Sequence, residues 1–95
     1  MESTLRTKEA NELFGAIAEL RSAAECKKFM RDLCTLAELK AMSERFKVAK
    51  MVSLEKSYRE ISKKTGASTA TVTRVAHWLH HGTGGYKLVL DRTAK

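Results

Sequence analysis

The chain has 95 residues, of which 43% are hydrophobic and 31% charged, a composition typical of one folded domain. No apolar run is long enough to span a bilayer or to act as a secretory signal, so we expect a cytoplasmic protein without membrane contact. The net charge of +7 arises entirely after residue 34, which suggests a neutral packing or dimerisation unit followed by a unit that binds a polyanion.

Apolar spacing predicts an all-α chain of about six helices. Apolar residues recur at helical spacing from Ala10 to Leu20 and predict a first helix over about 7–21. Capping boxes begin the next three helices at Ser22, Thr35 and Ser57. In each box the hydroxyl accepts a hydrogen bond from the backbone, and the glutamate three residues later reaches back to the amide of the capping residue.

The remaining boundaries follow from glycines and from one further cap. The third helix is expected to run to about Val52, with an apolar row at Leu39, Met42, Phe46 and Ala49. Gly66 ends the fourth helix, and Ser68 or Thr69 caps a fifth that runs to about residue 81. Three glycines within 82–85 break the chain before a short packing helix over 86–93.

Residues 57–79 have the pattern of a helix-turn-helix. Two helices that cross at a tight turn need apolar contacts from each helix and a turn residue that tolerates a left-handed backbone. Ile61 supplies the first contact and Gly66 the turn. The second helix supplies Val72, Val75 and Leu79.

The start of the second helix has the composition of a DNA-recognition helix. Small side chains let the backbone approach the major groove, where alanine or a threonine methyl can touch a thymine methyl and hydroxyls can bond bases or phosphates. Basic residues on both sides of the turn are suited to phosphates, and Arg59 is the side chain most suited to reading a guanine. The residues expected to contact DNA are Lys56, Arg59, Lys63, Ser68, Thr69, Ala70, Thr71, Thr73 and Arg74.

These segments resemble the tryptophan repressor superfamily, and most closely its YerC/YecD branch of tryptophan-repressor-like proteins. The similarity covers about 33–92 and is most specific in Thr-Gly-Ala-Ser-Thr-Ala-Thr-Val-Thr-Arg, residues 65–74. It implies an intertwined homodimer in which the N-terminal helices of each chain wrap around the other. It also implies a repressor that reads a two-fold operator in double-stranded DNA, with half-sites about one helical turn apart.

The resemblance also implies a possible effector pocket, formed by Arg45, Arg74, Val75 and Trp78. Arg45 and Arg74 match the two arginines that hold the tryptophan corepressor in the family's namesake. Val75 and Trp78 replace a glycine and a serine there, and both add bulk in the space that an indole ring would occupy. A small-molecule effector is therefore possible, but free tryptophan is not expected to be that effector.

We expect a single domain over 1–95, with dimerisation helices over 1–54, the DNA-reading head over 56–81 and a packing helix over 86–93. No catalytic residue set has a recognisable spacing, so an enzyme is not expected. The histidines at 77, 80 and 81 lack nearby acidic or cysteine ligands, so neither a metal site nor another cofactor is expected. Two alternatives stay open: a protein-interaction or antitoxin-like regulatory module that uses the same helices, and a nonspecific nucleic-acid binder.

Overall fold

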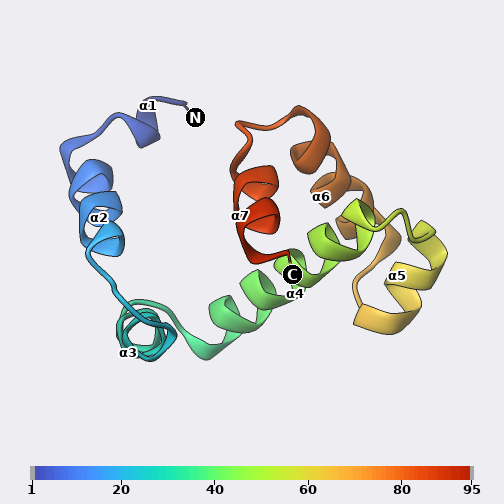
Figure 1. The fold of residues 1–95 in the computed structure, drawn as a ribbon, viewed down its shortest axis with the longest axis horizontal. Helices are drawn as coiled ribbons and strands as arrows, with labels where there is room; N and C mark the ends of the chain where they lie inside the picture. The colour runs from blue at the N-terminus through green and yellow to red at the C-terminus, as the bar shows by residue number, and fades with distance from the viewer. Residues whose placement is uncertain (1, 95) are drawn as a thin grey trace. The chain divides into compact units, whose positions relative to one another are not determined.

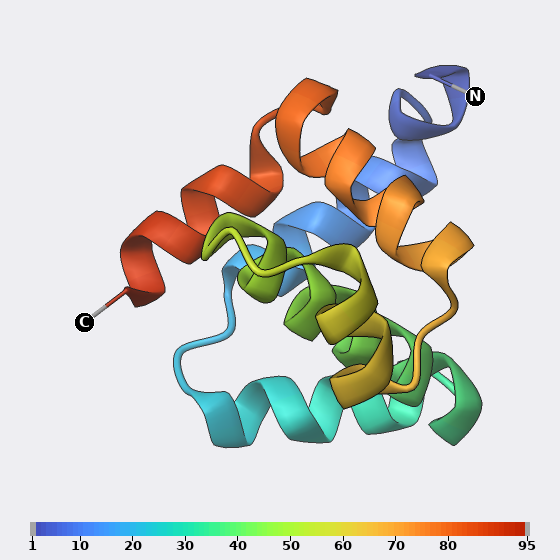
Figure 2. The ribbon, with the colours of Figure 1, turned by 90° about the vertical axis from the view of Figure 1, so that its right-hand side faces the viewer.

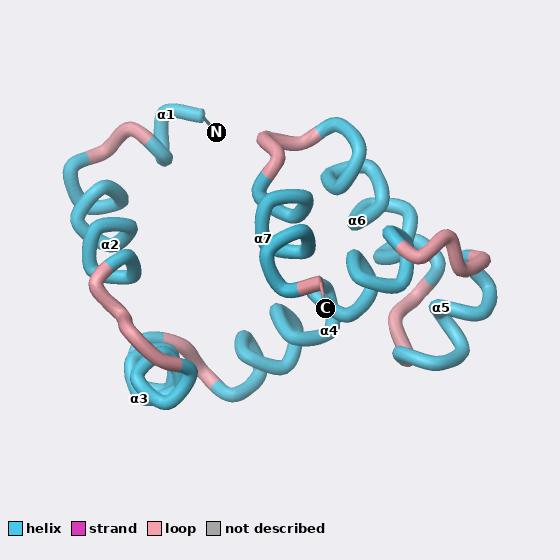
Figure 3. Tube along the Cα trace, viewed as in Figure 1, coloured by secondary structure: helices cyan, strands magenta, loops and turns pink. Residues whose placement is uncertain are grey.

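The computed structural model describes residues 2–94, and this part of the chain consists of helices joined by short loops, without strands (Figures 1 and 3). The all-α prediction and the six predicted helices are confirmed. The structure adds α1, a single turn that the sequence did not predict. The helices are α1 (Glu2–Leu5), α2 (Lys8–Ala18), α3 (Ala23–Leu33), α4 (Leu36–Ser53), α5 (Tyr58–Thr65), α6 (Thr69–His81) and α7 (Gly85–Thr93).

Hydroxyl caps begin α3, α5 and α6. Ser22, Ser57 and Ser68 each accept a hydrogen bond of 3.1 Å from the backbone amide three residues later. The carboxylates of Glu25 and Glu60 do not accept from the amides of Ser22 and Ser57, although the capping boxes predict these bonds. Glu60 pairs with Lys64 instead. The carboxylate of Glu25 accepts from the amide of Arg21 at 2.9 Å, because Ser22 is extended (φ −155°) and brings the preceding amide within reach.

The chain divides into two compact units, one up to Leu36 and one from Ala37 onward. In the first unit, α1 packs against α2. None of the residues described from 3 to 36 is buried. The apolar stripe of α2 is open to solvent, with Phe14 48% and Ile17 39% exposed. This unit has no core of its own within the single chain.

The second unit contains the hydrophobic core. The end of α4, the helices α5 and α6 and the turn between them supply its buried residues, and α7 packs against it (Figures 1 and 2). The buried residues are Val48, Ala49, Val52, Ile61, Ala67, Val72, Val75, Ala76 and Leu79.

The apolar row predicted for α4 is not the face that forms this core. Ala49 is buried, but Leu39 and Met42 are only half-buried and Phe46 is 39% exposed. Val48 and Val52 take the core positions instead. The helix therefore has two apolar faces that share Ala49. One face packs within the second unit, and the other remains accessible.

Candidate nucleic-acid interface

The turn between α5 and α6 is held by a left-handed glycine and two hydroxyls. Gly66 has φ 79°, and its amide donates to the carbonyl of Ser62 at 2.9 Å. The hydroxyl of Thr65 donates to the carbonyl of Ile61 at 2.7 Å and accepts from the amide of Ala67 at 3.1 Å. The Ser62 hydroxyl donates to the carbonyl of Ala67. These bonds satisfy the backbone of the turn and fix the direction in which α6 leaves it.

The apolar contacts predicted for the helix-turn-helix are confirmed. Ile61 and Val72 are 0% exposed, Val75 is 2% exposed and Leu79 is 4% exposed. Ala67 joins them from the turn, at 3% exposure. The C-terminal half of α4 completes the same cluster, so residues 56–81 share their core with the preceding helix.

Burial of one face of α6 leaves the predicted reading residues on the other. Successive residues of a helix are rotated by about 100°, so a helix that buries residues 72, 75, 76 and 79 turns 70, 74, 77 and 81 to solvent. Thr69, Ala70, Thr73 and Arg74 are exposed, and Thr71 is half-buried at the edge of this face. The described structure thus brings the small side chains and Arg74 together on one accessible surface.

The hydroxyls of this surface have different hydrogen-bonding states. Ser68 caps α6 and donates to the hydroxyl of Thr71 at 3.1 Å. The Thr73 hydroxyl donates to the carbonyl of Thr69 at 2.9 Å. The Thr69 hydroxyl has no hydrogen bond to any described residue, so its proton is available to a ligand. The sequence pattern identifies these residues but does not reveal which hydroxyls are already occupied.

Basic side chains flank the turn. Lys56, Arg59 and Lys63 are exposed and have no ion pair with any described residue. Lys64 is paired with Glu60 at 3.2 Å, which partly neutralises it. Residues 56–81 carry five basic side chains and one acidic side chain, so the surface around the turn is positive.

The residues considered for an effector pocket lie in different surroundings. Arg45, on α4, and Arg74, on α6, are both exposed. Val75 is part of the core, whereas Trp78 is 50% exposed and its ring meets that of His77 edge-on with 5.5 Å between centroids. Arg74 and Trp78 are one turn apart on α6.

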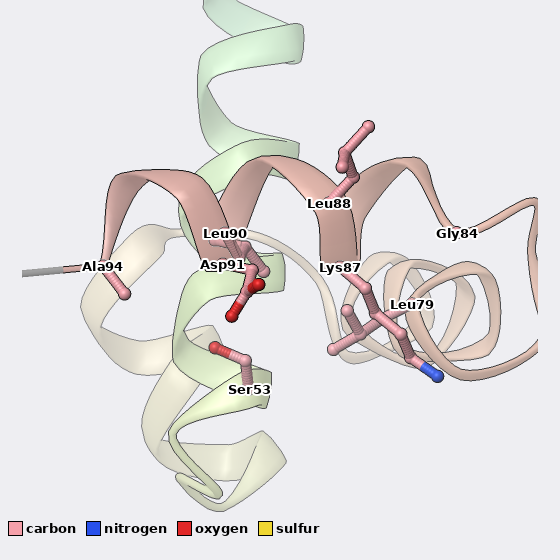
Figure 4. Close-up of a pocket in the computed structure, with 8 residues that line it drawn as sticks. All are labelled: Ser53, Leu79, Gly84, Lys87, Leu88, Leu90, Asp91 and Ala94. Carbon is pink, nitrogen blue, oxygen red and sulfur yellow. The ribbon is translucent and has the colours of Figure 1, made fainter.

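A shallow hollow of about 580 Å³ lies elsewhere, where α7 approaches the ends of α4 and α6 (Figure 4). None of the four predicted effector residues lines it. Figure 4 shows the side chains of Ser53 and Asp91 turned toward the same space. The lining residues are Ser53, Leu79, Gly84, Lys87, Leu88, Leu90, Asp91 and Ala94.

Neither a membrane helix nor a metal cluster occurs in the described part of the chain. None of the helices within 2–94 is long and apolar enough to cross a bilayer. Over the same residues, no three metal-binding side chains gather as a site would require. His77 and His81 lie on one face with ring centroids 5.3 Å apart, as expected from their spacing.

Comparisons with known proteins agree on one family. The family model of the Trp repressor protein matches residues 8–94. YerC of Bacillus subtilis (strain 168) is 42% identical over 88 residues, which cover 93% of this chain and 85% of YerC.

Solved structures are equally similar to the chain. A TrpR-like protein from Eubacterium eligens ATCC 27750 superposes with a TM-score of 0.89 at 42% identity and covers 95% of this chain and 93% of its own. A candidate Trp repressor from Staphylococcus aureus gives a TM-score of 0.88 at 42% identity, with 95% and 90% covered. The chain therefore belongs to the Trp repressor family.

Proposed function

We propose that this protein is a sequence-specific DNA-binding transcriptional regulator that acts as a repressor. One observation carries the proposal: the exposed face of α6 presents small side chains and Arg74 directly after a rigid turn with basic flanks. In a helix-turn-helix this face enters the major groove, while surrounding cations contact phosphates. Membership of the Trp repressor family supports the same interpretation.

The DNA-contacting residues have separate roles in this proposal. Lys56 and Lys63 contact phosphates and set affinity, and Arg59 reads a guanine. Ser68, Thr69, Ala70, Thr71, Thr73 and Arg74 form the surface of α6 that meets the bases and the adjacent backbone. The protein works in the cytoplasm, where DNA is its partner.

A homodimer is part of the proposal, since it would cover the apolar residues that the single chain leaves open. The first unit has no buried residue in its described part, and Phe14 is 48% exposed. The accessible face of α4 adds Phe46 at 39% exposure. Because these side chains are already partly buried, burying the rest against a second copy stabilises each by about 1 kcal/mol. Intertwined N-terminal helices would place two reading heads about 34 Å apart on a two-fold operator.

We infer that free tryptophan is not the effector. Val75 is fixed in the core of the reading head, and the indole of Trp78 already projects from α6 one turn beyond Arg74. A second indole near these bulky side chains would require repacking. A different small molecule, or no effector at all, fits these residues better.

The test is an in vitro selection with purified protein and random duplex DNA at about 150 mM salt, where nonspecific binding is weak. Enrichment of one palindromic motif supports the proposal. Absence of any motif, together with loss of binding at this salt concentration, would reject it. Weak salt dependence of any complex that forms with a protein partner would instead favour the protein-interaction module, because apolar docking responds little to salt.

A further inference from the structure

We propose that Thr73 reads a thymine in each half-site through its methyl group, and that its hydroxyl donates no hydrogen bond to DNA. The inference rests on the proposed function and deepens it, because it names a base and the chemical group that recognises it. Thr73 is exposed on the face of α6 that the core leaves open.

The hydroxyl of Thr73 is already occupied as a donor. A threonine hydroxyl has one proton, and here that proton is directed to the carbonyl of Thr69 at 2.9 Å. Guanine N7 and O6, adenine N7 and thymine O4 are all acceptors at the edge of the major groove, so each needs a donor from the protein. Thr73 cannot supply one while the bond within α6 persists. The hydroxyl oxygen could still accept from the amino group of adenine or cytosine, but thymine carries no donor in the major groove. For thymine, the methyl group is therefore the part of the Thr73 side chain left for recognition.

The neighbouring residue strengthens the apolar character of this spot. Ala70 precedes Thr73 by three residues, which places the two side chains side by side on the exposed face of α6. Together they present two methyl groups. Among the bases, only thymine carries a methyl group in the major groove, so an apolar contact there distinguishes thymine from the other three bases. Thr69 is then the residue that can donate a hydrogen bond to DNA, because its hydroxyl has no bond to any described residue.

Deoxyuridine provides a direct test, because it pairs as thymidine does but lacks the 5-methyl group. Two selections are run in parallel, one with a thymidine library and one with a deoxyuridine library, and the selected duplex is then titrated with either base at single positions. We expect both libraries to give the same motif except at the contacted position, where the preference weakens with deoxyuridine. Affinity should fall about fourfold per half-site when the contacted thymine becomes uracil, the ratio for losing one buried methyl.

Two variants assign the effect to Thr73. Thr73→Val keeps the methyl and removes the hydroxyl, so the ratio of thymidine to deoxyuridine affinities should persist. Thr73→Ser keeps the hydroxyl and removes the methyl, so that ratio should fall toward one. Thr93→Ser is the matched control, because Thr93 makes the same bond to the carbonyl of Val89 at 2.8 Å on another helix.

The outcomes separate this inference from the proposed function. A motif that binds equally well with thymidine and with deoxyuridine overturns the methyl contact and leaves sequence-specific DNA binding intact. A ratio that is lost in Thr73→Val and kept in Thr73→Ser also overturns it, because the hydroxyl would then be the reading group. Failure of both libraries to yield a motif rejects the proposed function and this inference together.

Discussion

Gly66 donates its amide to the carbonyl of Ser62 at 2.9 Å while its own backbone is left-handed, with φ 79°. This pair closes α5 and reverses the chain toward α6 within three residues. The left-handed conformation turns the chain away from the axis of α5 after this bond, and residues with a Cβ atom rarely adopt it. The orientation of the exposed face of α6 thus depends on a residue with no side chain.

Replacing Gly66 by alanine should destabilise the protein by about 1–2 kcal/mol, the cost of a left-handed conformation for a residue with a Cβ atom. No atom lies within 4 Å of the added Cβ, so the cost arises from the backbone and not from a clash. The melting temperature of Gly66→Ala, compared with that of the parent protein, measures this loss of stability. Gly85→Ala is the control, since Gly85 begins α7 without a left-handed φ and its added Cβ lies 4.0 Å from the Thr83 hydroxyl. Equal melting temperatures for the two variants would contradict the argument.

Removing the cap of α6 should also lower stability. Ser68→Ala deletes the acceptor for the amide of Thr71 at 3.1 Å, a loss of about 1 kcal/mol at a helix N-terminus. Chemical denaturation without DNA gives the value directly. Ser43→Ala removes a hydroxyl from the middle of α4, where it donates to the carbonyl of Leu39, and should change stability by less than about 0.5 kcal/mol. Equal free energies of unfolding for Ser68→Ala and Ser43→Ala would mean that the Ser68 cap does not stabilise α6.

The helices and the turn could be predicted because their signals are local. A serine before a helix and a glycine after one determine which backbone amides and carbonyls are satisfied, and Ser22, Ser57, Ser68 and Gly66 all act as expected. The Ser62 and Thr65 bonds across the turn were not predicted. Side chains that return to the backbone through a tight turn leave no periodic pattern in the sequence.

The face of α4 that forms the core could not be predicted for a different reason. Its apolar residues occupy two faces, so spacing alone does not tell which face meets the rest of the same chain. Packing of α5 and α6 selects Val48 and Val52, and Phe46 stays accessible. The residues of α6 that we expect to contact DNA were chosen by residue type and position, and their role in binding stays a prediction.

A single charge on the apolar stripe of α2 should dissociate the proposed dimer. Phe14→Asp introduces a carboxylate at a side chain that is 48% exposed in the single chain, and burying that charge in an interface would be costly. Sedimentation should show a shift toward monomer and a lower melting temperature. Gly15→Asp carries the same charge on the next residue, about 150° around the helix from the centre of the stripe, and should stay dimeric. A Phe14→Asp protein that sediments like the parent would exclude α2 from the interface.

Arginine and lysine near the turn should affect DNA binding in different ways. Arg59→Ala removes a planar group able to bond guanine O6 and N7, so operator affinity should fall by about 1–3 kcal/mol and discrimination at one base pair should relax. Lys63→Ala removes a phosphate contact, so binding should weaken for all sequences and the salt slope should decrease by about one. Titrations of the operator and of a scrambled duplex at several salt concentrations separate the two effects.

Lys28→Ala is the matched control for these titrations, because Lys28 is an exposed cation on α3, outside the reading head. It removes the same net charge as Lys63→Ala, so an effect of overall charge alone would make the two variants equivalent. Our assignment requires that only the substitution near the turn changes the salt slope. It also requires that Arg59→Ala narrows the gap between operator and scrambled DNA while Lys63→Ala keeps it. If Arg59→Ala and Lys63→Ala both weaken binding equally to operator and scrambled DNA, then Arg59 contacts the DNA backbone and another residue reads the base.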